Sequence, residues 1–265
     1  MDRHLGARML TGIVALPVLF FLVHLGATAY LAYTFLVVLC GAWEWWRLSG
    51  RPAGAGGLLL GVAGSLGALQ AGIDARPERW LVFLAFMLLL WTLAGLGSRD
   101  EGSARRAGAG LLGMLYVGLL PAFLVRIRGL EGGREALFLT YATVFLCDTA
   151  AYSVGRALGR RPLWPAVSPR KTLEGAIGGL AGAVAAALAG MYAFAPALGP
   201  AGAVGFGLIA GILGQAGDLV ESRWKREAGL KDSSAILPGH GGVLDRFDNL
   251  HFVAPVLYIY LTMFL

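Results

Sequence analysis

The stretch AGAVGFGLIAGILGQAGDL, from Ala201 to Leu219, forms an apolar run that ends beside an acid. A membrane-crossing helix needs about 20 apolar residues, so this run is long enough to span a bilayer. Almost directly after it comes SRWKREAGLKDSSAILPGHGGVLDRFD, from Ser222 to Asp248, a densely charged segment in an otherwise apolar chain. An apolar span followed by such a charged segment indicates a polar site at a membrane surface.

The whole chain has the composition of a membrane protein. It has 265 residues, of which 57% are hydrophobic and 14% charged, whereas soluble domains carry about 25% charged residues. Backbone that faces lipid must satisfy its own hydrogen bonds, so the spans are expected to be helices. The predicted fold is all-α, a polytopic integral membrane helical bundle of about nine transmembrane helices. The nine apolar runs are Leu10–Leu25, Ala27–Trp43, Ala53–Ile73, Trp80–Leu96, Gly108–Val125, Ala136–Tyr152, Leu173–Phe194, Ala201–Leu219 and Leu250–Leu265.

The basic residues indicate the orientation of this bundle. If nine spans alternate and the Ser222–Asp248 segment is cytoplasmic, 17 of the 22 Lys and Arg residues lie on the cytoplasmic side. The other face then holds only Arg76, Arg79, Arg126, Arg128 and Arg134. Cytoplasmic loops carry the excess of basic residues in membrane proteins. We therefore expect a multi-pass protein of the plasma (inner) membrane, with its active site facing the cytoplasm.

The two halves of the chain differ in character. Residues 1–135 place few polar groups inside spans and are expected to be structural or lipid-contacting. Residues 136–265 are expected to be catalytic, with cytoplasmic loops over 153–172 and 220–249. This half carries Asp148 within a span and Asp218 at the end of another. Intramembrane acids are costly and usually face a polar cavity or a cation, although helix capping or pairing with an arginine would also account for them.

Three polar clusters fall on the expected cytoplasmic side. The first includes Ser168, Lys171 and Thr172 at the start of a span, where free helix amides suit a phosphate; plain helix capping is the alternative. The second surrounds Asp218. The third is the long charged segment, in which Gly241 and Gly242 allow close approach of a ligand to the backbone. Cations bind phosphate oxygens and clustered carboxylates bind Mg²⁺, so the clusters predict a phosphoryl- or nucleotidyl-transfer site.

The charged segment resembles the signature of the phosphatidate cytidylyltransferases, or CDP-diacylglycerol synthases. That signature is Ser-x-aliphatic-Lys-Arg, four residues, Lys-Asp, and then Pro-x-His-Gly-Gly-x-x-Asp-Arg-x-Asp. Trp224 departs from it by standing where an aliphatic residue or Phe is usual. The resemblance extends to Asp148 and to the run from Ser168 to Gly175, and it covers the first half of the chain only in hydropathy. The matching residues of the charged segment are Ser222, Lys225, Arg226, Lys231, Asp232, Pro238, His240, Gly241, Gly242, Asp245, Arg246 and Asp248.

The resemblance implies the reaction CTP + phosphatidate → CDP-diacylglycerol + pyrophosphate. It implies a site that uses Mg²⁺, and it leaves undecided whether a second cation also binds. The expected metal ligands are Asp218, Asp245, Asp248 and Asp148. The expected phosphate contacts are Lys171, Lys225, Arg226, Lys231 and Arg246, with Ser168, Thr172, Gly241 and Gly242 holding the nucleotide. His240 is interpreted as a phosphate or leaving-group contact, because a phosphate monoester with a second pKa near 6 needs little activation; a general base and a loop-structural role remain alternatives.

Other functions are weaker matches. A related membrane cytidylyltransferase or kinase that acts on an isoprenoid lipid would use a similar site. An ion-coupled transporter would need polar residues through several spans and an inverted repeat, and the sequence has neither. The expected partners are CTP, phosphatidate and the lipid bilayer, without nucleic acid. The sequence leaves the oligomeric state open, a homodimer included.

Overall fold

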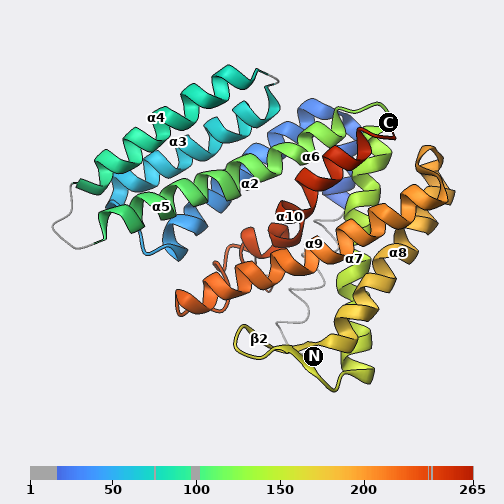
Figure 1. The fold of residues 1–265 in the computed structure, drawn as a ribbon. Coiled ribbons are helices and arrows are strands. Elements are labelled where there is room, and N and C mark those ends of the chain that lie inside the picture. The colour runs from blue at the N-terminus through green and yellow to red at the C-terminus, as the bar shows by residue number, and fades with distance from the viewer. Residues whose placement is uncertain (1–16, 75, 97–101, 238, 240, 265) are drawn as a thin grey trace.

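Helices make up most of the molecule. The computed structural model describes residues 17–74, 76–96, 102–237, 239 and 241–264 (Figure 1). A helix over 17–25 precedes the first group, which is α2 (Ala27–Leu48), α3 (Gly54–Ile73), α4 (Pro77–Leu96), α5 (Ser103–Gly113), the π-helix η1 (Met114–Leu119) and α6 (Leu120–Arg128). The second group is α7 (Gly133–Leu158), strands β1 (Pro162–Trp164) and β2 (Ser168–Thr172), α8 (Leu173–Phe194), the 3-10 helix η2 (Pro196–Leu198), α9 (Gly199–Glu227) and α10 (Leu244–Leu261).

Seven of the nine expected spans are recovered in the part of the chain that the structure describes. Long, apolar helical stretches cover Ala27–Leu48, Gly54–Ile73, Glu78–Gly95, Ser103–Arg128, Gly133–Leu158, Leu173–Phe194 and Pro196–Glu227. The expected run Leu10–Leu25 lies partly outside the described residues. α10 is not among the seven, and its first turns carry Asp245, Arg246 and Asp248. The prediction of a polytopic helical membrane protein is confirmed.

The two expected loops are shorter and more ordered than the sequence indicated. Residues 153–158 continue α7, and the rest of the first loop is mostly the antiparallel hairpin of β1 and β2, which the all-α prediction did not include. In the second, α9 continues to Glu227 and α10 begins at Leu244, so the connection covers only residues 228–243. The second loop is shorter than expected because α9 is longer than a membrane span. The 29 residues of α9 extend about 44 Å, whereas the hydrocarbon core is about 30 Å thick.

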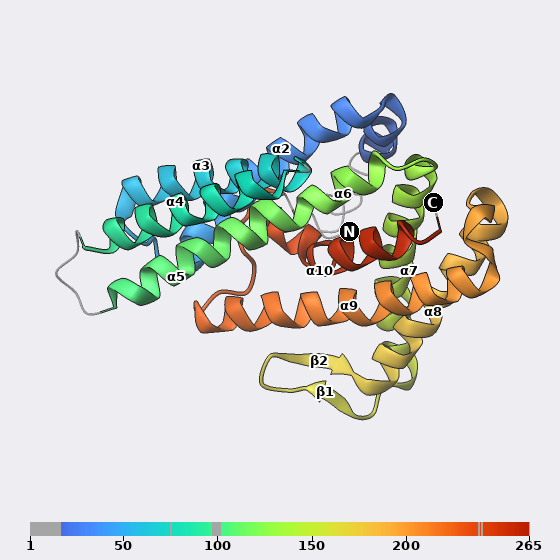
Figure 2. The ribbon, with the colours of Figure 1, turned by 45° about the horizontal axis from the view of Figure 1, so that its top comes forward.

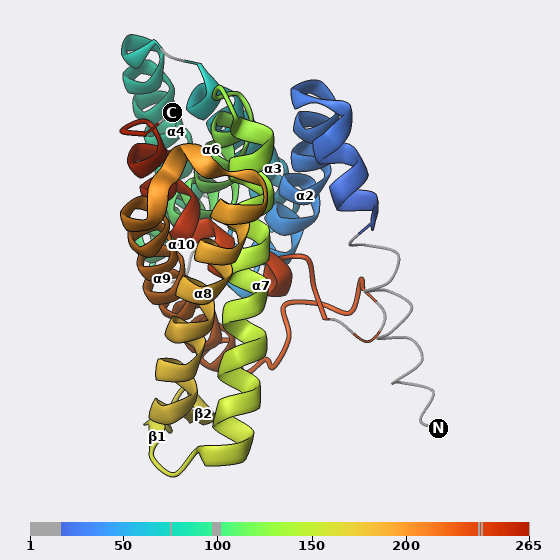
Figure 3. The same ribbon diagram turned by 90° about the vertical axis from the view of Figure 1, so that its right-hand side faces the viewer.

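Close packing joins α7 and α8 along their length, and the hairpin lies at their shared end (Figures 2 and 3). Glycines of α8 make this contact possible. A Cβ atom on Gly182 would lie 2.5 Å from the Cβ of Ala150, and one on Gly175 would lie 2.8 Å from the carbonyl oxygen of Ala151. Small residues let membrane helices approach one another closely. The contact places Asp148, within α7, near the start of α8, where the predicted phosphate cluster lies.

Candidate active site

A cavity of about 510 Å³ lies between α7, α8 and α9, beside the hairpin of β1 and β2. Its volume is within the range of about 300–1,000 Å³ that small-molecule sites commonly occupy. Three cations and two carboxylates line it, together with Tyr152, Thr172 and Gln215; the charged residues are Arg156, Arg170, Lys171, Asp148 and Asp218. Asp148, Lys171, Thr172 and Asp218 were predicted from the sequence, and the structure brings these four together. The excess of cations suits an anionic ligand.

The carboxylates of the cavity are already engaged by neighbouring side chains. The Lys171 ammonium contacts Asp218 Oδ2, and the Ser222 hydroxyl donates to Asp218 Oδ1 over 3.1 Å. Asn249 Nδ2, from α10, donates to Asp148 Oδ2 over 2.8 Å. These contacts join α7, α9, α10 and β2, so four elements that are distant in sequence position the polar groups of one cavity.

The N-terminus of α8 opens at the cavity. Thr172 caps it, because its hydroxyl accepts a hydrogen bond from the Gly175 amide over 3.1 Å. Glu174 Oε2 accepts bonds from the amides of Arg160 and Arg161, at 3.0 and 3.2 Å, and so holds the turn between α7 and β1. The helix capping that was the alternative interpretation of this cluster is therefore present. The helix N-terminus also places positive partial charge beside Lys171.

One face of α9 carries the site's second set of charges. Asp218, Glu221 and Lys225 follow the i, i+3, i+7 spacing that puts side chains on one side of a helix. Asp218 lines the cavity, whereas Glu221 and Lys225 are buried against α10. Lys225 Nζ lies 3.3 Å from Glu221 Oε1 and 2.6 Å from Asp245 Oδ1. The charged stripe therefore connects the cavity with a buried cluster at the start of α10.

Asp245 is the centre of that buried cluster. Its carboxylate accepts bonds from Lys225, from the amide of Gly242 over 2.7 Å, and from the amide and hydroxyl of Ser233, each over 3.0 Å. Burial disfavours the charged carboxylate, but Lys225 and the two amides outweigh that effect and hold the pKa of Asp245 below its usual value. Asp245 is thus a charged group with its oxygens occupied, and its predicted role as a metal ligand stays a prediction.

The two motif glycines, Gly241 and Gly242, lie against the carboxylates of Asp245 and Glu44. Gly241 has a φ of 81°, which favours glycine, and a Cβ there would lie 2.6 Å from Asp245 Oδ2. A Cβ on Gly242 would lie 1.9 Å from the Ser233 hydroxyl and 2.6 Å from Glu44 Oε1. The Gly242 amide donates to Asp245, and the predicted role of Gly242 in holding the nucleotide stays a prediction.

Two residues of the N-terminal half reach this cluster, and sequence reasoning missed both. Glu44, in α2, is fully buried and accepts hydrogen bonds from the connection 228–243 and the start of α10. Tyr116, in η1, donates to Glu221 Oε2 over 3.0 Å. The one sequence signal for Glu44 is an acid among the tryptophans of the run Trp43–Trp46.

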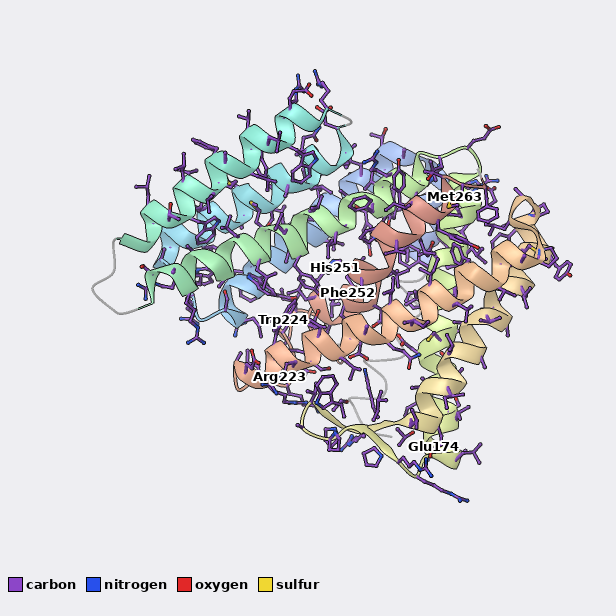
Figure 4. All side chains as sticks on the ribbon, viewed as in Figure 1. Glu174, Arg223, Trp224, His251, Phe252 and Met263 are labelled. Carbon is purple, nitrogen blue, oxygen red and sulfur yellow. The ribbon has the colours of Figure 1, made fainter. Side chains whose placement is uncertain are left out.

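Aromatic rings close the cluster on its N-terminal side. The ring of Trp224 stands edge-on to those of Trp45 and Tyr116, each with centroids 5.0 Å apart. His251, on α10, stands edge-on to Tyr116 at 4.6 Å. Figure 4 shows Trp224, His251 and Phe252 gathered between α9 and the N-terminal helices. The departure from the signature at position 224 is thus an aromatic contact between the two halves.

The remaining predicted residues that the structure describes differ in their contacts and exposure. Arg226 bonds the carbonyl oxygens of Val167 and Leu230, which ties α9 to the hairpin. Ser168 is half-buried in β2, and Lys231 and Arg246 are exposed. Asp248 is buried near Glu221 and Asp218. His240 lies outside the described residues, so its predicted role remains a prediction.

The donor atoms of the cavity decide whether it suits Mg²⁺. Among the described residues, no three His, Cys, Asp or Glu side chains form a metal centre on their own. However, Mg²⁺ at phosphate-binding sites is commonly held by one or two carboxylates together with substrate phosphates and water. Asp148 and Asp218 line the cavity, and Asn249 Oδ1 is buried without a hydrogen-bond partner in the described residues. This donor set fits an ion that arrives with a nucleotide.

Comparison with known proteins identifies the family. Residues 6–264 match the family model described as the cytidylyltransferase family. The chain belongs to this family. A phosphatidate cytidylyltransferase of Staphylococcus haemolyticus is 34% identical, over 96% of this chain and 98% of the relative. One from Bacillus subtilis is 34% identical over 97% of each chain, and one from Staphylococcus aureus is 40% identical over 68% of each. The chain is therefore a multi-pass membrane nucleotidyltransferase that uses CTP.

Proposed function

We propose that this protein transfers the cytidylyl group of CTP to phosphatidate and releases pyrophosphate. The observation that carries the proposal is the cavity with three cations and two carboxylates at the ends of membrane-spanning helices. A lipid phosphate can reach such a position from the bilayer, and a nucleotide can reach it from water. The relatives named phosphatidate cytidylyltransferases support the same lipid substrate.

The reaction joins two anions, so neutralising charge is the first requirement. An oxygen of the phosphatidate monoester attacks the α-phosphorus of CTP, a new P–O bond forms, and the bond to the β-phosphate oxygen breaks as pyrophosphate leaves. The monoester has a second pKa near 6 and is mostly dianionic at neutral pH. No general base has to be supplied by the protein.

Residues of the cavity have separate roles in this proposal. Lys171, Arg170 and Arg156 line the cavity as cations and would bind phosphate oxygens, with the N-terminus of α8 adding positive potential. Asp218 and Asp148, with Asn249, would hold Mg²⁺. Mg²⁺ supplies charge neutralisation at the transferring and leaving phosphates. Lys171 and Asp218 contact each other in the structure. For Lys171 to bind a phosphate, this contact must break, so that Lys171 takes the substrate as its partner and Asp218 takes the cation.

The buried cluster has a different proposed role. Lys225 and Asp245 pair with each other in the structure, so they would organise the connection 228–243 around the cavity. Lys231, Arg246 and His240 belong to this connection or to the start of α10 and are proposed as phosphate contacts. We place the site on the cytoplasmic face of the plasma membrane, on the basis of the basic-residue distribution.

Pyrophosphate release in detergent tests the proposal. Purified protein should release pyrophosphate when CTP, Mg²⁺ and phosphatidate are all present, and a chelator should stop the release. A polyprenyl phosphate in place of phosphatidate tests the alternative isoprenoid substrate. Turnover with the isoprenoid and none with phosphatidate would refute the proposed substrate.

A further inference from the structure

Glu44 is a buried acid that the proposed chemistry does not use. Its side chain comes from α2, far from the cavity in sequence, and it has 0% exposure. Four donors surround its two oxygens. The amides of Val243 and Leu244 donate over 2.8 Å each and the Ser234 hydroxyl donates over 2.6 Å, while the Ser233 hydroxyl lies 3.0 Å away and shares its single proton with Asp245. A buried carboxylate is tolerated only with such compensation.

The start of α10 depends on this acid. The first amides of a helix have no partner within the helix, and Val243, at the N-cap position, has no side-chain acceptor. Glu44 supplies the missing acceptors from another helix, and its negative charge suits the positive end of α10. Gly242 leaves room for it, because a Cβ there would overlap both Glu44 oxygens, at 2.6 and 2.7 Å.

Glu44 also shares a partner with Asp245. The Ser233 hydroxyl lies 3.0 Å from Glu44 Oε2 and 3.0 Å from Asp245 Oδ2. Both ends of the segment 233–244 are therefore held by the same pair of carboxylates. The signature residue His240 lies within this segment in chain order, and Lys231 and Asp232 directly precede it.

We infer that Glu44 is a positioning residue for cytidylyl transfer, holding the segment 233–244 and the start of α10 in the arrangement that turnover requires. The inference rests on the proposed function for its kinetic part. Its structural part, the hold on the segment, stands on the four hydrogen bonds alone. Because a displacement of about 1 Å in a catalytic group costs about 100-fold in rate, losing this hold should lower kcat more than it changes KM for CTP.

The sharpest test is Glu44→Gln. The side chains match in size, but the amide nitrogen of Gln would face a backbone N–H, donor against donor. We expect kcat to fall by up to about 100-fold, with a smaller change in KM. Hydrogen–deuterium exchange should become faster at 233–244. Glu44→Asp keeps the charge and should recover part of kcat. The matched control is Glu78→Gln, an exposed acid in the first turn of α4.

Each outcome bears on the inference. Glu44→Gln with the kcat and exchange of wild type would overturn it, as would a uniform loss of stability with unchanged kcat per folded molecule. If Glu44→Gln does not fold, Ser234→Ala removes only one donor and should give a smaller change in the same direction; no change in either readout would also overturn it. If the wild-type protein showed no cytidylyl transfer, the proposed function would be refuted. The exchange measurement would still test whether Glu44 holds the segment 233–244.

Discussion

At the scale of single residues, Gly242 shows how tightly the buried cluster is packed. Its missing side chain makes room for Glu44 and Ser233. We expect Gly242→Ala to abolish most turnover and to lower thermal stability, because the new methyl group would push against two hydrogen-bonded groups. Turnover and melting temperature in detergent measure this. Gly108→Ala is the control, since a Cβ atom there would meet no neighbouring group within 4 Å; equal effects of the two changes would contradict the packing argument.

Asp218 and Asp245 should respond differently to the same substitution. Both Asn variants are expected to lose turnover. Asp245 is buried against Lys225, with side-chain exposures of 4% and 10%, whereas Asp218 is 29% exposed. Removing one partner of a buried ion pair commonly costs about 3–5 kcal/mol, so Asp245→Asn should also unfold at a clearly lower temperature. Asp218→Asn should remain close to wild type in stability. If Asp218→Asn were the less stable variant, the division into cavity and buried cluster would be wrong.

The lowered pKa of Asp245 adds a pH dependence to its stability contribution. Because the folded-state pKa lies below the unfolded value of about 3.9, the contribution is complete above that value. It is lost as the pH falls through the folded-state pKa. The melting-temperature difference between wild type and Asp245→Asn should therefore be constant from neutral pH to about pH 5 and shrink in stronger acid. A difference that grew in acid would have the wrong sign.

At the scale of elements, η1 connects the N-terminal helices with the catalytic ones. π-helical turns are often found at functional sites, and this one presents Tyr116 to Glu221. Tyr116→Phe keeps the ring contacts with Trp224 and His251 but removes the hydroxyl. We expect a stability loss of about 1.5–3 kcal/mol, the range for a hydrogen bond to a charged group, and a lower kcat.

The control for Tyr116→Phe is Tyr192→Phe, on a ring that is 77% exposed. Chemical or thermal unfolding in one detergent compares the two variants directly. If both variants unfolded alike and kept the same kcat, the contact between η1 and α9 would have no measurable role.

At the scale of the whole molecule, topology is the prediction to test. We expect the connection 228–243 and the turn between α6 and α7 to lie on opposite faces of the membrane. Cys40 and Cys147 are free and would first be replaced by Ala. An impermeant thiol reagent applied outside intact cells should then label Glu131→Cys but not Ala228→Cys. Labelling of Ala228→Cys from outside would invert the proposed orientation.

The class of fold and the chemistry of the site could both be predicted from the order of the residues. Long apolar runs can only be helices in lipid, and the cations and acids of the charged segment predicted nucleotidyl transfer before any geometry was known. Lys171, Thr172, Asp148 and Asp218 were predicted to lie in the site, and the cavity unites them. The predictions of fold class and activity are confirmed because they depend on local composition and on spacing along the chain, whereas the roles of these four residues stay predictions.

The contacts of each charged group, by contrast, depend on how the helices pack. Glu44 lies about two hundred positions before its partners Val243 and Leu244, and no spacing rule connects residues so distant in sequence. Likewise, the occupied oxygens of Asp245 and the steric need for Gly242 arise where α2, α9 and α10 meet. A side chain's residue type sets which contacts it can form, whereas its burial and its partners are settled only when the helices come together. That is why Asp218 lines the cavity, whereas Asp245 became a buried support.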